Sequence, residues 1–169
     1  WPDLVESLEA ELALTDSVEA RVALLFRIGE IRRARLEEVG SALEAFRDAL
    51  ALDASHAGVR AQVEALLTHE GVRREAADVL RPIYEEDKNH EGLIRTLDIQ
   101  IEFADTAEQR ITLFALATDT LENSIGDAKR AFTYAAKAFG EAASTEAAST
   151  WYARVEALAE KTGDRPAEY

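Results

Sequence analysis

The sequence predicts an all-α protein built from antiparallel helical hairpins packed side by side, with about ten helices and no β-sheet. Three observations predict this fold class. Ala, Leu, Glu and Arg, which are strong helix formers, dominate the 169 residues, and only three prolines and eight glycines interrupt them. No segment alternates apolar and polar residues with the period of two that a half-buried strand shows. The chain also repeats itself with a period of 34 residues, as helical repeat proteins do.

Apolar residues recur at helical spacing along the chain, and turn residues separate the segments. We expect helices at residues 3–14, 17–36, 40–52, 57–70, 73–86, 91–103, 106–123, 127–140 and 146–161, with a tenth helix starting at 165. Asp16-Ser17 and Asp105-Thr106 are N-cap types, because their side chains can accept a hydrogen bond from an otherwise unpaired amide. Gly71 and Gly163 are expected just past helix ends, in the left-handed conformation that glycine adopts at low cost.

The period of 34 relates two stretches, "GSALEAFRDALALDASH" and "EAADVLRPIYEEDKNH". Ala76 corresponds to Ala42, and Leu80 corresponds to Phe46. Two antiparallel helices approach closely only where small side chains lie at their crossing. We therefore predict that Ala42 and Ala76 lie at helix crossings, and that Phe46 and Leu80, one turn further on, fill the space between successive hairpins.

A second match has a shift of 89 residues and indicates a duplication. The stretch from Leu4 matches the stretch from Leu93, with identities at Leu8 and Leu97, Asp16 and Asp105, Glu19 and Glu108, and Arg21 and Arg110. The sequence thus predicts one helical-repeat domain over 1–169, made of a duplicated unit, 1–89 and 90–169. The chain contains no Met and starts at Trp1, so we expect it to be excised from a longer protein.

The repeated pattern resembles the tetratricopeptide repeat family, whose 34-residue unit follows W-x2-L-G-x2-Y…A-x3-F…P. The residues that carry the resemblance are Ile28-Gly29, Ala42, Phe46, Ala49 and Ala54 in the first copy, Val63, Leu67, Ala76, Leu80 and Ile83 in the second, and Ala117, Leu121, Ala131 and Ala138 in the third, with a fourth copy starting at Val155. The family's Trp and Tyr positions are mostly replaced, and its closing proline reads Ala54, Lys88 and Ala143. The resemblance implies a right-handed α-solenoid of helical hairpins.

In that family, the first helix of each hairpin lines a concave surface that binds a partner. Carried over position by position, the resemblance implies partner-binding residues at Phe26, Arg27, Glu30, Arg33, Gln62, His69, Asp119, Asn123 and Arg154. The Lys/Asn set with which some members hold a peptide's terminal carboxylate is missing, since Ala61 and Ala65 stand where two of its members are expected. The resemblance therefore argues against a receptor for such carboxylate tails.

Composition narrows the possible partners. The formal net charge of −14 disfavours nucleic acid, whose phosphates the summed field would repel. The chain contains no cysteine, which excludes disulfides and thiolate metal sites, and no run of eighteen apolar residues predicts a membrane span. The compartment stays open between cytoplasm and periplasm, with the cytoplasm preferred. The excess of Arg over Lys, together with abundant Ala, is typical of a GC-rich bacterial genome.

Two Asp-x-x-His pairs are the main chemical motif in the sequence. Asp53/His56 and Asp87/His90 could share a metal ion, as Glu-x-x-His pairs do in di-iron bundles. They recur at the 34-residue spacing in expected turns, however, where Asp ends one helix and His opens the next, so we predict structural roles. The sequence contains no catalytic constellation or phosphate loop. We expect no enzyme activity, metal or cofactor.

The function predicted from the sequence is that of a protein–protein interaction scaffold, which binds a partner peptide or helix on a concave helical surface. Arg27, Arg32 and Arg33 form a basic spot on an acidic chain, so an acidic segment of the partner could dock there. The alternative is a non-catalytic helical accessory or spacer domain of a larger enzyme or assembly protein. The sequence does not predict an oligomeric state.

Overall fold

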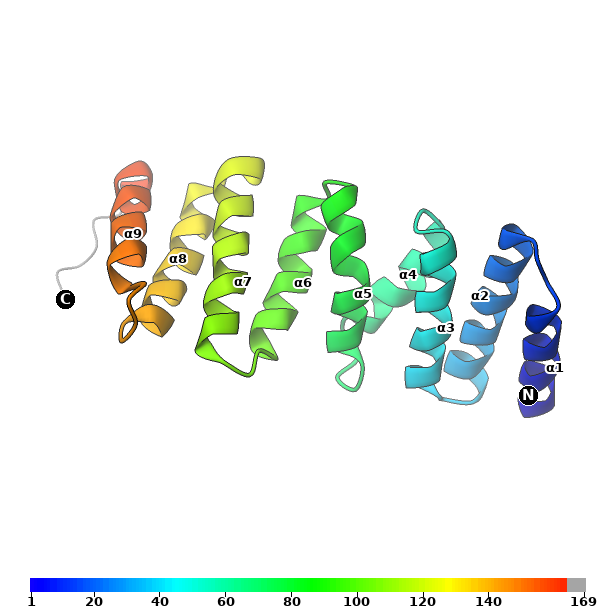
Figure 1. Ribbon diagram of the computed structural model, residues 1–169. Helices are drawn as coiled ribbons and strands as arrows, with labels where there is room; N and C mark the ends of the chain where they lie inside the picture. Colours follow the sequence, from blue (N-terminus) through cyan, green and yellow to red (C-terminus); the bar gives the residue numbers. More distant parts are fainter. Residues whose placement is uncertain (164–169) are drawn as a thin grey trace. The chain divides into compact units, whose positions relative to one another are not determined.

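The computed structural model describes residues 1–163, and within that range the chain is all-helical, with no strand (Figure 1). Its elements are α1 (Pro2–Ala13), α2 (Val18–Arg35), α3 (Val39–Leu52), α4 (Ala57–Leu66), α5 (Arg73–Glu86), α6 (His90–Glu102), α7 (Ala107–Asp119), the π-helical segment η1 (Thr120–Ile125), α8 (Ala128–Ala142) and α9 (Ala148–Thr162). The predicted all-α class is confirmed. Residues 1–163 form nine α-helices rather than the predicted total of about ten, and the tenth helix, expected from 165, lies outside the described residues.

Two helix ends differ from the sequence prediction. The helix expected at 57–70 ends at Leu66, because the following turn closes through bonds from the amides of Val72 and Arg73 to the carbonyl of His69, at 3.0 and 2.9 Å. The helix expected at 106–123 becomes a π-helix at Thr120. The Thr118 and Thr120 hydroxyls there donate to carbonyls four residues back, which bends helices.

The predicted N-caps are confirmed. The Ser17 hydroxyl accepts a hydrogen bond from the amide of Ala20, and the Thr106 hydroxyl accepts one from the amide of Gln109, whose side chain completes a capping box. Gly163 is left-handed as predicted, with a φ of 73°. The same expectation for Gly71 is wrong: its φ is not positive, and the turn around it closes through the His69 carbonyl without a left-handed residue.

The chain divides into two compact units, Trp1–Ile83 and the part from Tyr84 onward. In the first unit, α2 and α3 form a close antiparallel hairpin, and α1 packs on α2. The ring of Phe46 is fully buried against α2, where Gly29 leaves room for it. Around this ring the small residues of α3 are buried too, namely Ala42, Ala45 and Ala49. The alanines thus allow the close approach of the two helices.

In the second unit, α8 packs against both α7 and α9. The fully buried residues of α8 are all alanines, Ala131, Ala135, Ala138 and Ala142. Polar contacts join neighbouring helices at the surface: Arg110 of α7 pairs with Glu141 of α8 at 2.9 Å, and Arg130 of α8 pairs with Glu91 of α6 at 2.8 Å. The buried alanines of α8 thus resemble those of α3 in the first unit, while ion pairs join the helices at the surface.

Several local bonds recur at positions 89 residues apart. The amide of Glu38 donates to the carbonyl of Arg32 at 2.9 Å, and the amide of Asp127 donates to that of Leu121 at 2.8 Å. The residues just before these amides, Glu37 and Gly126, are both left-handed, with φ of 59° and 79°. The two helix ends are thus built alike, at the shift of the sequence match.

Candidate functional site

The structure brings together two of the predicted partner-binding residues of the first unit. The guanidinium of Arg33 on α2 donates a hydrogen bond to the side-chain oxygen of Gln62 on α4. Phe26 has a packing role, because its ring lies 6.2 Å from that of Phe46 and 5.6 Å from that of His56. Arg27 and Glu30 are exposed on α2 and line a cavity of about 320 Å³ together with Trp1, Leu4, Ile31, Ala34 and Arg35.

The remaining predicted residue of this unit lies off the helices. His69 is exposed in the turn between α4 and α5, where its carbonyl holds the first amides of the next helix. The sequence analysis predicted that this helix continues to residue 70, because Leu66 and Leu67 continue its apolar pattern. His69 is therefore a turn residue in the structure.

In the second unit, Asp119 and Arg154 form an ion pair with each other. Arg154 also pairs with Glu122 at 3.2 Å, and Glu122 pairs in turn with Lys161. The hydrogen bond from Lys161, followed by the contact with Arg154, lowers the pKa of the Glu122 carboxyl. Asn123 is exposed on η1 beside this network. The charged groups that the sequence assigned to a partner thus bind one another across η1, α7 and α9.

The predicted basic spot is partly neutralised within the first unit. Arg32 pairs with Glu9 of α1 and donates a second bond to the carbonyl of Ser41 at 3.3 Å. Arg33 is bonded to Gln62, and Arg27 is exposed. Docking of an acidic segment at this spot stays a prediction.

The first Asp-x-x-His pair serves the turn and the cap. Asp53 accepts bonds from the amide and the hydroxyl of Ser55, at 2.9 and 2.6 Å, and the hydroxyl bond is the main reason that the pKa of its carboxyl is lowered. His56 caps α4, since its Nδ1 accepts the amide of Val59 at 3.2 Å. Residues 1–163 contain no group of three or more His, Asp or Glu side chains placed to hold a metal ion.

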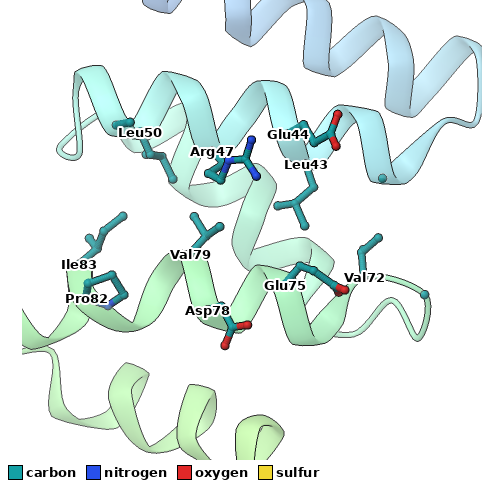
Figure 2. Close-up of a pocket in the computed structure, with 13 residues that line it drawn as sticks. Leu43, Glu44, Arg47, Leu50, Val72, Glu75, Asp78, Val79, Pro82 and Ile83 are labelled. Carbon is teal, nitrogen blue, oxygen red and sulfur yellow. The ribbon is translucent and has the colours of Figure 1, made fainter. Parts of the chain in front are cut away.

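A larger concave site lies between α3 and α5 of the first unit, and the sequence interpretation did not identify it (Figure 2). We call it the α3–α5 groove. It has a volume of about 780 Å³ and is lined by Gly40, Leu43, Glu44, Arg47, Leu50, Ala51, Gly71, Val72, Glu75, Asp78, Val79, Pro82 and Ile83. Figure 2 shows Leu43 and Leu50 of α3 and Val79 and Ile83 of α5 pointing toward the opposite helix. Glu44 and Glu75 lie at one end of the groove.

The groove follows from a second stripe on α3. Three alanines of α3 are buried, namely Ala42, Ala45 and Ala49, whereas Gly40, Leu43, Arg47 and Leu50 follow one another at steps of three or four residues along the groove. On α5 the same spacing runs through Glu75, Asp78 or Val79, and Pro82 or Ile83. The signal in the sequence was the seven-residue spacing of Leu43 and Leu50 and of Val72 and Val79. It could not show that the two stripes face each other.

Three comparisons with known proteins identified no relative of this chain. No model of a known protein family matches this chain, and searches of curated proteins and of solved structures found no significant match. None of the helices within 1–163 is both long and apolar enough to cross a membrane.

Proposed function

We propose that this chain is a protein–protein interaction scaffold, built from helical hairpins of the tetratricopeptide type in a right-handed solenoid, which binds a segment of a partner protein. The α3–α5 groove carries this proposal. Its volume of about 780 Å³ lies in the range of ligand-binding pockets, and its lining combines apolar residues with charged ones. An apolar centre with a polar rim is the usual anatomy of a protein interface.

The exposed residues of the groove are suited to contact a partner. Glu44 and Ala51 of α3, and Glu75 and Pro82 of α5, are exposed, while Leu43, Leu50, Val72 and Ile83 are mostly buried beneath them. A partner side chain that entered the groove would bury apolar surface, at about 25 cal/mol per Å². The walls are formed mainly by residues of two helices, so little ordering would be needed on this side of the interface.

The inner surface of α2 and α4 is a second candidate site, because the resemblance to the family assigns the ligand there. In its favour, the bond between Arg33 and Gln62 joins the two helices side by side, and Arg27 and Glu30 are exposed next to a small cavity. That cavity, of about 320 Å³, is lined by α1 and α2 with no residue of α4, and it has less than half the volume of the groove. We therefore place the main binding site in the groove.

Two matched substitutions separate the two surfaces. Ala51 on the groove wall and Ala65 of α4 are both exposed and both stand next to the last residue of their helices. Ala51→Arg and Ala65→Arg introduce the same side chain, which is a strong helix former, so both variants are expected to fold. The wild-type chain and each variant are used to capture proteins from a lysate of the source organism, and each captured protein is quantified by mass spectrometry.

A partner that is enriched by the wild-type chain and by Ala65→Arg but lost with Ala51→Arg supports the proposal. Loss with Ala65→Arg alone would move the binding site to the inner surface of α2 and α4. Failure of the wild-type chain to enrich any protein over Ala51→Arg and Ala65→Arg would refute the proposed function, and would favour the alternative of an accessory or spacer domain.

A further inference from the structure

We infer that the occupant of the α3–α5 groove is an amphipathic helix whose apolar face is flanked by Lys or Arg. The inference rests on the proposed function and names the chemistry of the partner. The groove-lining part of α3 runs from Gly40 to Ala51, eleven residue steps and thus about 16 Å, or three helical turns. A partner helix that inserts side chains at steps of three and four residues matches stripes of that length and spacing.

The charges of the rim select a basic partner. Two exposed carboxylates line the groove on opposite walls, those of Glu44 on α3 and of Glu75 on α5, whereas Asp78 of α5 points away from α3 (Figure 2). Arg47 is the cation among the described residues of the lining, and its guanidinium is bonded to the carboxylate of Asp48 at 3.2 Å. The rim is therefore acidic, on a chain whose net charge is −14. A cleft with an excess of one sign of charge attracts the opposite charge.

Glu44 and Glu75 carry most of this inference. Both are exposed, and neither forms an ion pair within residues 1–163. Figure 2 shows them at the same end of the groove, on opposite walls, with Leu43 and Val72 beside them. A cation on the partner could thus lie near carboxylates of both helices while an apolar side chain of the partner enters between them. A second copy of this chain is a poorer match, because it brings the same excess of negative charge.

Two labelled peptides test the partner's charge. Each has about 16 residues, the length at which isolated helices begin to form, and carries leucines on one face. One peptide has lysines on both sides of that face, and the other has glutamates at the same positions. Binding to the full chain is followed by fluorescence anisotropy. We expect the lysine peptide to bind about tenfold more tightly, since two exposed ion pairs differ between the complexes. The preference should shrink between about 0.1 M and 1 M salt, as the Debye length falls from about 10 Å to about 3 Å.

Charge reversal locates the effect in the groove. Glu44→Lys with Glu75→Lys should abolish the preference for the lysine peptide or reverse it. The control is Glu6→Lys with Glu11→Lys, which changes the net charge equally at exposed positions of α1. This control should leave the preference within about twofold of wild type. Far-UV circular dichroism of both double variants verifies that the helices are intact.

Three results would overturn the inference: equal binding of the two peptides, no binding of either, or equal effects of the two double variants. A concentration-dependent dimer that Ala51→Arg dissociates in sedimentation would overturn it too, because a second copy would then occupy the groove. These failures are distinguishable from failure of the proposed function. The comparison of Ala51→Arg with Ala65→Arg in the lysate decides whether any partner uses the groove, whatever its charge.

Discussion

Gly29→Ala tests how tightly the hairpin of α2 and α3 is packed. A Cβ atom at this position would lie 2.3, 2.7 and 2.8 Å from three carbons of the Phe46 ring, whereas packed side-chain atoms normally stay beyond 3.0 Å. The ring cannot easily move away, because it is fully buried and the ring of Phe26 lies 6.2 Å from it. The substitution therefore forces the two helices apart or the ring out of its position.

The expected loss of stability is about 2 kcal/mol. Overpacking of a core costs about 1–3 kcal/mol, and the clash with three ring atoms at once favours the upper end. Against this, alanine is favoured over glycine in a helix interior by roughly 1 kcal/mol. The free energy of unfolding is measured by urea titration, followed by circular dichroism of the helical signal. Gly40→Ala is the control, because no atom lies within 4 Å of a Cβ there, and it should leave stability unchanged or raise it by up to about 1 kcal/mol.

A double-mutant cycle separates the clash from other effects of the new methyl group. Phe46→Leu removes the ring atoms that the new Cβ would meet, so Gly29→Ala should cost much less in the Phe46→Leu background than in the wild type. If Gly29→Ala is as stable as the wild type, or if the two substitutions are additive, the described packing of α2 on α3 is wrong.

Two further predictions concern the helix end at Gly126 and the ion pairs of the second unit. Gly126→Ala should lower the free energy of unfolding by about 1–2 kcal/mol, because its φ of 79° disfavours a side chain. Glu37→Gly, at the corresponding left-handed position, should raise the free energy of unfolding. Urea titration measures both values, and changes of the same sign would contradict the prediction. Glu122→Gln should remove a contribution that is present at neutral pH. Because the bond from Lys161 lowers the pKa of Glu122 in the folded state, that contribution is full above the unfolded pKa of about 4.3 and is lost as the pH falls through the lower folded value. The difference in unfolding free energy between wild type and Glu122→Gln should therefore be constant from about pH 6 to 8 and vanish in acid, and a difference that persists at about pH 2 would contradict the assigned ion pairs.

Local features of the chain were predictable because they depend on neighbouring residues. The caps at Ser17 and Thr106 follow from a hydroxyl placed before a helical run. The buried faces of α3 and α8 follow from alanines at helical spacing, among them Ala42 and Ala131. The π-helical turn at Thr120 was missed because the apolar pattern continues through it. There, hydroxyl bonds to the preceding turn prevailed over helix propensity.

The candidate sites were less predictable. The sequence analysis predicted Arg33 and Gln62 on one partner-binding surface. The structure brings them together, but Arg33 donates its hydrogen bond to the side-chain oxygen of Gln62 and not to a partner. Asp119 and Arg154 were likewise assigned to a partner and are paired with each other. A periodic pattern shows which face of a helix a charge occupies. It does not show which charges on other helices lie within reach.

The sequence by itself determined that the chain is helical, where most helices begin and end, and which faces carry small residues, since hydrogen bonding and side-chain spacing along one helix depend on residues a few positions apart. Only the tertiary structure decided that the stripe of Leu43 and Leu50 faces that of Val79 and Ile83 across an open groove. The physical reason is that two stripes from helices separated along the chain can meet or point apart without any change in their own periodicity, and only the packing of the hairpins chooses between these arrangements.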